Sequence, residues 1–292
     1  MSRILRMIGN KRVSIILPYF ERPEVLIITL RSFQALYSKS QVEIIIVDDG
    51  SHKNLKPLLP PGFTLPTKLV SITNKDGINP CIPINIGVTE ASGEFILLTS
   101  PEIVHTESIF SAMGNTDVGK NECLFFNVFA LTDSDINFRL ISSESHESLI
   151  EIYKSFEHEL EKNLGLNGYK WSNLHGSWYC HPIYRKTDLN FLSLMRRSSF
   201  FEVGGFDERY RKGSGFDDNE FRRRMLSFGF KFRYQGSSTA IHLIHEEVST
   251  RPDFNIGINS NEKLFKSRFK RIMFRKSIGI KHNYKISKVN FS

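Results

Sequence analysis

The sequence has few cysteines and no long apolar run. Cys81, Cys123 and Cys180 lie far apart without a CxxC spacing, which argues against a zinc knuckle and a disulfide framework and favours buried thiols. The longest aliphatic runs, such as residues 44–47, are far below the roughly 18 residues of a membrane span. The N-terminus also lacks the apolar core of a secretory signal. We therefore expect a cytoplasmic protein.

Two glycine-rich phosphate-binding patterns are also missing. No GxGxxG follows the first apolar strand and no GxxxxGK[ST] occurs anywhere, which argues against dinucleotide-binding and P-loop sites. Internal repeats and low-complexity tracts are absent as well. With 40% hydrophobic and 24% charged residues, the 292-residue chain has the composition of a globular protein with one large domain or two small ones.

Acidic residues are missing from residues 263–292, which hold ten of the 39 lysines and arginines. The rest of the chain is nearly neutral, with 29 basic and 31 acidic residues. In "KLFKSRFKRIMFRK", residues 263–276, apolar side chains recur at spacings of three and four among basic ones, which predicts a basic amphipathic helix. Such a helix can lie on an anionic membrane, bind nucleic acid or pack on its own domain. We expect residues 263–292 to form a tail after a domain of residues 1–262.

The first hundred residues alternate apolar strands with helical stretches. Strands are predicted at 13–18, 42–50, 68–73 and 94–100, and helices at 23–37 and 81–92. Because these strands are too apolar for burial on one side only, they predict an α/β fold with a parallel sheet covered by helices on both faces.

Polar groups follow each of these strands, at 18–22, 48–51, 74–77 and 100–102. Ligands of such sheets bind beyond the carboxyl ends of the strands, so we expect the site there. Acidic strand ends without a glycine cradle favour phosphates held through a divalent cation.

The second half of the chain gives weaker signals. "NECLFFNVFAL" predicts a strand at 121–131, and apolar residues at helical spacing predict a helix over 144–165. The aromatic-rich segment 169–186 could stack on a sugar or a base, or form an ordinary surface loop. Both alternatives stay open.

Two further segments carry candidate site residues. Asp217, Asp218 and Glu220 open a predicted helix, and three acids exceed what a helix cap needs, so a cation, a basic partner or a substrate is expected to offset their repulsion. His242 and His245 lie in a predicted strand at 238–247. Being three apart, they should project to opposite faces, so we expect only His245 to join Glu102.

Four segments resemble, in order, the motifs of the family 2 glycosyltransferases of the GT-A fold. The segments are "VSIILPYFERPEVL", "EIIIVDDGS", "NKDGINPCIPINIGVTEASGEFILLTSPE" and "GGFDERYRKGSGFDDNEFRRRM". The resemblance covers residues 12–246 and implies a Rossmann-like, mostly parallel sheet flanked by helices. It also implies a nucleotide-sugar-binding half at 1–105 and an acceptor-side half at 106–262, with the basic helix as a C-terminal extension.

The resemblance places Ser100 and Glu102 at the two aspartates of the family's DxD motif, so the chain resembles a subset in which the motif reads Ser-Pro-Glu. Glu102 would then coordinate Mn²⁺ or Mg²⁺, with His245 completing the site. Losing one carboxylate weakens ion binding and leaves open a site with little metal dependence.

The resemblance also implies roles for the other site residues. Asp218 would be the general base that activates the acceptor hydroxyl, and Asp217 would support it or bind the donor sugar. The remaining residues would contact the donor, a UDP-sugar being favoured: Pro18, Phe20, Glu21, Asp48, Asp49, Asn74, Gly77, Asn85 and Ser100.

The sequence therefore predicts an inverting glycosyltransferase that moves a sugar from a nucleoside diphosphate to a hydroxyl of a saccharide or a lipid-linked saccharide. The basic tail would allow peripheral contact with a membrane. Two alternatives stay open. The acceptor could be a hydroxylated base in DNA, as for viral DNA-modifying enzymes, or the chain could be a non-catalytic relative that binds a sugar or nucleotide.

Overall fold

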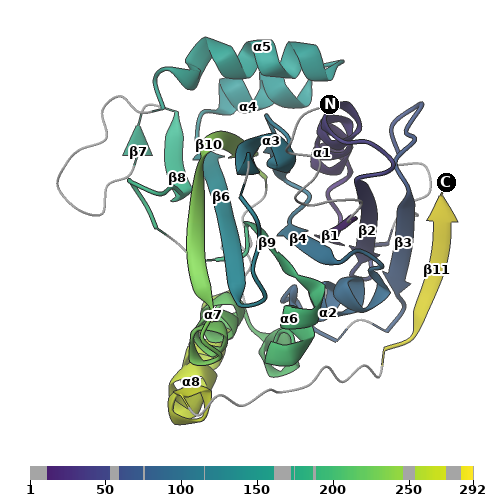
Figure 1. Cartoon of the computed structure of the whole chain (residues 1–292). Helices are drawn as coiled ribbons and strands as arrows, with labels where there is room; N and C mark the ends of the chain where they lie inside the picture. Colours follow the sequence, from purple (N-terminus) through teal and green to yellow (C-terminus); the bar gives the residue numbers. More distant parts are fainter. Residues whose placement is uncertain are drawn as a thin grey trace.

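A central β-sheet with helices on both faces forms the body of the computed structural model (Figure 1). The structure describes residues 12–52, 59–74, 76–114, 116–160, 172–173, 175–186, 189–245, 254–273 and 284–291. In these ranges the main strand order is β11-β3-β2-β1-β4-β9-β6-β10-β5, and the β7–β8 hairpin pairs with β6. The strands are β1 (Val13–Tyr19), β2 (Val42–Asp48), β3 (Thr67–Ile72), β4 (Phe95–Thr99), β5 (Ile103–His105), β6 (Glu122–Leu131), β7 (Ser172–Asn173), β8 (Gly176–Cys180), β9 (Leu192–Arg196), β10 (Lys231–His242) and β11 (Ile286–Phe291).

Six of the described strands run in one direction, which confirms the predicted mostly parallel α/β sheet. β1 is parallel to β2 and β4, β2 to β3, and β6 to β10. β9 lies antiparallel between β4 and β6, so β4 and β6 point the same way. β9 and the antiparallel edge strand β11 were not predicted from the sequence pattern. Apolar alternation also carries no information on strand direction, so it could not have shown that both run antiparallel.

Helices cover the sheet in two layers, which Figure 1 shows above and below it. The upper layer holds α1 (Pro23–Leu36), α3 (Ile109–Met113), α4 (Ser134–Ile141) and α5 (His146–Glu157). The lower layer holds α2 (Cys81–Glu90), α6 (Arg197–Val203), α7 (Asp217–Ser227) and α8 (Phe254–Met273). Only part of the helix predicted over 144–165 forms α5, and residues 161–165 lie outside the described residues.

Alternating side chains of the strands feed two separate apolar clusters. Ile15 and Leu17 of β1 belong to the cluster that packs under α1, whereas Ile16 belongs to the cluster that packs on α2. Both faces are therefore buried, as the continuous apolar strands predicted. This double burial leaves the carboxyl edge of the strands as the place where polar side chains can gather.

The predicted tail of residues 263–292 lies only partly within the described residues. Its boundary at residue 263 falls inside α8, which already begins at Phe254 and packs against α7, where Phe265 contacts Phe216 with ring centroids 5.7 Å apart. Further along, β11 pairs with β3 and closes one edge of the sheet. Of the three alternatives for the basic helix, packing on its own domain is therefore the one observed at Phe265. None of the helices described is both long and apolar enough to span a bilayer.

Candidate functional site

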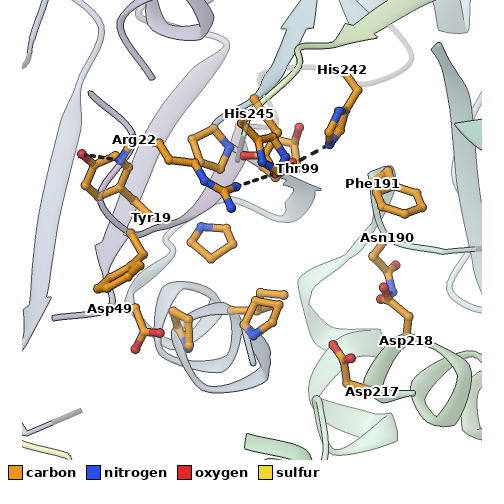
Figure 2. A pocket seen from close by; sticks show the side chains of 18 of the residues that line it. Tyr19, Arg22, Asp49, Thr99, Asn190, Phe191, Asp217, Asp218, His242 and His245 are labelled. Atoms are coloured by element: carbon orange, nitrogen blue, oxygen red, sulfur yellow. Dashed lines mark hydrogen bonds and ion pairs between the residues drawn. The ribbon is translucent and has the colours of Figure 1, made fainter. Parts of the chain in front are cut away.

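A cavity of about 360 Å³ lies at the carboxyl edge of the parallel strands. Residues from both halves of the chain line it: Pro18, Tyr19, Phe20, Arg22, Asp49, Ile78, Pro80, Pro83, Ile84, Thr99, Ser100, Pro101, Glu102, Tyr179, Asn190, Phe191, Asp217, Asp218, His242 and His245. Glu102 and Asp218, 116 positions apart in the numbering, therefore share one cavity. Figure 2 shows Tyr19 and Asp49 on one side of it and Asn190, Phe191 and Asp218 on the other.

Glu102, His242 and His245 form a cluster with the geometry of a cation site. Oε1 of Glu102 lies 3.7 Å from Nε2 of His242 and 3.5 Å from Nε2 of His245. One potential ligand atom from each residue falls within 4.8 Å of the others. The expectation that the two histidines face opposite ways was therefore wrong. Strand β10 ends at His242, so the alternation of an extended chain does not continue to His245.

Strand pairing explains why Glu102 meets these histidines. The short strand β5 begins one residue after Glu102 and runs antiparallel to β10, so Ile103 pairs with His242. The amide of Leu243 then donates a hydrogen bond of 2.9 Å to the carbonyl of Glu102. The side chain of Thr29 donates another, of 2.6 Å, to the carbonyl of Pro101. The loop that carries the predicted metal ligand is thus fixed by the chain at the end of β10 and by helix α1.

The donor set fits a divalent cation. Glu102 is 8% exposed, and its Oε2 has no hydrogen-bond partner among the described residues. Burial lowers the pKa of His242 to about 4, so its imidazole is neutral near pH 7 and can offer a nitrogen lone pair. The guanidinium of Arg22 also lies beside this cluster, 3.4 Å from Oε1 of Glu102. This arginine was not among the predicted metal-site residues.

Asp217 and Asp218 reach the cavity from the first turn of α7 (Figure 2). The preceding residue, Phe216, adopts a left-handed conformation with φ 64°, which is rare for a bulky residue and costs about 1–3 kcal/mol. Two asparagines hold the acids. Asn79 donates a hydrogen bond of 2.9 Å to Oδ1 of Asp217, and Asn190 donates one of 2.9 Å to Oδ1 of Asp218.

Both carboxyl groups bind protons more tightly than usual. Burial, with a further contribution from the charge of Asp217, raises the pKa of Asp218 to about 7. Burial also raises the pKa of Asp217, against the opposing hydrogen bond from Asn79. An oxygen base with a pKa near 7 is well matched to taking up a proton at neutral pH.

Helix α8 braces the loop that presents these acids. The side-chain amide of Asn261 donates hydrogen bonds to the carbonyls of Tyr210, at 3.1 Å, and Gly215, at 2.8 Å. A Cβ on Gly213 would lie 2.4 Å from atoms of α8, so only glycine allows this close approach. The C-terminal region is thus structurally tied to the site.

Four of the predicted donor residues line the cavity: Pro18, Phe20, Asp49 and Ser100. Five others do not: Glu21, Asp48, Asn74, Gly77 and Asn85. The side chains of Glu21 and Asp48 accept hydrogen bonds from the backbone amides of His52, at 2.5 Å, and Ser51, at 3.0 Å. Asn74 accepts one of 2.8 Å from the amide of Lys285. These three side chains therefore organise loops beside the site.

Gly77 and Asn85 also have structural contacts in place of the expected ones. A Cβ on Gly77 would lie 2.3 Å from the carbonyl oxygen of Arg211, which accepts hydrogen bonds from two nearby backbone amides. Asn85 is fully buried, and its amide bonds both the carbonyl, at 2.9 Å, and the N–H, at 2.8 Å, of Phe206. It therefore ties α2 to the Gly-Gly-Phe-Asp turn at 204–207.

Of two aromatic residues beside Asn190 and His242, Tyr179 falls in segment 169–186, which was expected to stack on a sugar or a base or to form a surface loop, whereas Phe191 was not singled out from the sequence. Tyr179 and Phe191 line the cavity and stack with ring centroids 4.7 Å apart. In β8, side chains alternate, so Trp178 is buried against Phe129 while Tyr179 is half-buried at the cavity. Asn190 and Phe191 come just before β9, whose antiparallel direction puts its start beside the carboxyl end of β4, where Leu192 pairs with Thr99. No local sequence signal marks these two residues.

Comparison with known proteins gives a family match for part of the chain. Residues 14–106 match the model of glycosyl transferase family 2, which is less than half of the chain. No curated protein sequence matches the chain.

The solved structures with a similar fold include GalNAc-T7, TarS and the mannosyltransferase PcManGT. GalNAc-T7 with UDP, GalNAc and Mn²⁺ is 15% identical with a TM-score of 0.56, over 90% of this chain and 50% of that one. TarS from S. aureus is 11% identical with a TM-score of 0.52, over 88% and 39%. The mannosyltransferase PcManGT from Pyrobaculum calidifontis with GDP-Man and Mn²⁺ is 15% identical with a TM-score of 0.46, over 82% and 58%.

These likenesses establish the fold, an α/β GT-A fold, through the two structures with TM-scores above 0.5. The chain spans at most 58% of the length of these three proteins. The ligands named with these structures, which are UDP, GalNAc, GDP-Man and Mn²⁺, are ligands of those proteins.

Proposed function

We propose that the chain is an inverting glycosyltransferase that moves a sugar from a nucleoside diphosphate to an acceptor hydroxyl. The strongest support is that Glu102 and Asp218 line the same cavity. Glu102 belongs to the candidate cation cluster, and Asp218 is the proposed general base. The family match of residues 14–106, in which Glu102 falls, supports the same reaction class.

The donor would lie across the cavity from Asp49 toward Glu102. Pro18, Phe20 and Asp49 would contact the base and ribose, for which uracil is favoured, and Ser100 would contact a ribose hydroxyl. The diphosphate would then reach the cluster of Glu102, His242 and His245.

Those three residues would hold a Mn²⁺ or Mg²⁺ ion, which neutralises charge on the leaving diphosphate when bound. The unpartnered buried Oε2 of Glu102 favours Mn²⁺ or Mg²⁺ at this place, because both ions take carboxylate oxygen as a ligand.

Asp218 would act as the general base. Its carboxylate takes the proton of the acceptor hydroxyl as the oxygen attacks the anomeric carbon. The bond from that carbon to the diphosphate oxygen breaks on the opposite face, the nucleoside diphosphate leaves, and the anomeric configuration inverts. The amide of Asn190 occupies Oδ1, which directs Oδ2 of Asp218 toward the incoming alcohol.

The experiment that tests this function measures release of nucleoside diphosphate from UDP-, GDP- and dTDP-sugars, with and without Mn²⁺. We expect turnover with one donor class and a loss of about 10² to 10⁴ fold in Asp218→Asn. The matched control is Asp76→Asn, an exposed aspartate outside the cavity, which should retain activity. Turnover that survives Asp218→Asn unchanged would remove the base assignment. Donor binding without any turnover would favour a non-catalytic binding protein.

A further inference from the structure

The aromatic pair on the acceptor side has no role in the chemistry above. Tyr179 and Phe191 come from β8 and from the segment before β9, and they stack at 4.7 Å with an interplanar angle of 29°. Both rings are partly exposed at the cavity while packing on the core cluster that contains Leu192. Apolar ring surface left exposed to solvent is unfavourable by about 25 cal/mol per Å², so covering it with a ligand contributes to binding.

The surroundings of the pair restrict the chemistry of that ligand. One edge adjoins His242, whose ring centroid lies 4.8 Å from that of Tyr179, and Arg185 lies 5.9 Å from the centroid of the Tyr179 ring. On the other side, Asn190 directly precedes Phe191 in the chain and is hydrogen-bonded to Asp218. In Figure 2, Phe191 and Asn190 lie on the side of Asp218, away from Asp49.

We propose that Phe191, stacked on Tyr179, is the binding platform for the acceptor, and that the acceptor is a pyranose whose apolar C–H face lies on the Phe191 ring. The proposal rests on the proposed function and specifies its acceptor. A sugar ring has an apolar face and a hydroxyl-bearing edge, which suits an aromatic ring flanked by hydrogen-bonding groups. Its nucleophilic hydroxyl then faces Oδ2 of Asp218, because Asn190 fixes both the carboxylate and the start of the segment that carries Phe191.

The rigidity of the platform supports this assignment. The Phe191 ring is held by Tyr179 on one side and by the core cluster behind it, so little side-chain entropy is lost when a sugar binds. The neighbouring Ser193 donates a hydrogen bond of 2.9 Å to Asn190, which fixes that amide in turn. Platform and base therefore belong to one connected unit.

The test compares Phe191→Leu, Phe191→Ala and Phe191→Tyr with the wild type. Leucine keeps the apolar packing and removes the ring, so it guards against loss of folding in the alanine variant. The matched control is Phe138→Ala on α4, where the phenylalanine is 72% exposed and outside the cavity. Binding of methyl pyranosides to UDP-loaded protein is followed by saturation-transfer NMR, which needs no turnover. The acceptor KM is measured in parallel.

We expect pyranosides to bind about tenfold more weakly to Phe191→Leu and Phe191→Ala, and within about twofold of wild type to Phe191→Tyr and Phe138→Ala. Affinity that is unchanged in Phe191→Leu would overturn the platform. Binding of hydroxymethylated pyrimidine nucleosides in preference to every pyranoside would overturn the acceptor class. If UDP binds and no pyranoside does, the platform is refuted and the proposed function is not. If pyranosides bind and this binding is lost in Phe191→Leu, but no donor is turned over, the proposed function is refuted and the platform is not.

Discussion

The side-chain amide of Asn190 donates a hydrogen bond of 2.9 Å to Oδ1 of Asp218, which lies in a different element on the same wall of the cavity. This bond favours the ionised carboxylate and so opposes the burial that raises the pKa of Asp218 to about 7. Asn190 thus sets both the orientation and the proton affinity of the proposed base.

Asn190→Ala is expected to raise the pKa of Asp218 further, because a donor to the charged form is lost. A general base works when ionised, so activity falls as the pH drops through its pKa, and the acidic limb of the kcat–pH profile should move to higher pH. We expect kcat to fall about tenfold near pH 7, with the donor KM little changed. Ser193→Ala, which removes the bond that fixes Asn190, should shift the limb in the same direction by less. An unshifted limb in both variants would show that Asn190 does not act on the base.

Asp218→Asn is expected to stabilise the protein at high pH. A carboxyl group with a raised folded pKa contributes stability below its unfolded pKa, and that stability is lost as the pH rises from about 4 to about 7. The Tm of the variant should therefore exceed that of wild type by about 2–5 °C at pH 8 and approach it near pH 4.

Asp133→Asn provides a control of opposite sign. Hydrogen bonds, the largest from the amide of Ile136, lower the pKa of Asp133, so its stabilisation is present at neutral pH and lost in acid. This variant should lose stability at pH 7. Thermal unfolding across pH measures both, and a gain for Asp218→Asn that grows toward acid would contradict the raised pKa.

Glu102→Gln is expected to weaken Mn²⁺ binding by about tenfold or more, because the anionic oxygen of the cluster is lost. Titration calorimetry or the electron paramagnetic resonance of free Mn²⁺ measures the affinity without any turnover. His242→Asn should weaken binding as well. Glu122→Gln, at the start of β6 and therefore at the opposite edge of the sheet, is the control. Equal Mn²⁺ affinity in wild type and Glu102→Gln would place any cation elsewhere.

Arg22→Gln is expected to tighten Mn²⁺ binding by about threefold, opposite to the effect of Glu102→Gln. The guanidinium lies 3.4 Å from Oε1 of Glu102, where it competes with a cation for that oxygen and repels it. The same titration measures this variant. Arg31→Gln is the control, because Arg31 lies on α1, which begins just after Arg22, but it bonds the carbonyl of Ser143 at 2.8 Å outside the cavity. Weaker Mn²⁺ binding in Arg22→Gln would mean that Arg22 supports the cation cluster.

Asn85→Ala separates the structural role of Asn85 from the donor contact that its family position implied. Loss of the buried hydrogen bonds to Phe206 should reduce the free energy of unfolding by about 2–3 kcal/mol. Denaturant titration measures this, and UDP affinity, measured below the unfolding transition, should stay close to that of wild type. The control, Asn290→Ala, changes an exposed residue of β11. Weaker UDP binding with an unchanged free energy of unfolding would indicate that Asn85 contacts the donor.

Residues whose role depends on local pattern were predictable. The strands at Val13–Tyr19 and Val42–Asp48 and the helix at Pro23–Leu36 follow from apolar periodicity, and the acids after parallel strands follow from the chain direction. The family resemblance, rather than local pattern, implied that Glu102 and Asp218 act on the same substrates, and both line one cavity. Asn85 was expected at the donor because the sequence alone does not distinguish an asparagine that makes buried structural hydrogen bonds from one that contacts a ligand.

The sequence alone determined that polar side chains would collect at one edge of a doubly covered sheet, because apolar strands leave them no other position. Tertiary structure decided which distant residues join them. The antiparallel course of β9 brings Asn190 and Phe191 to that edge, and the pairing of β5 with β10 brings His242 to Glu102. Strand order and register depend on packing between segments far apart in the chain, so no local pattern encodes them.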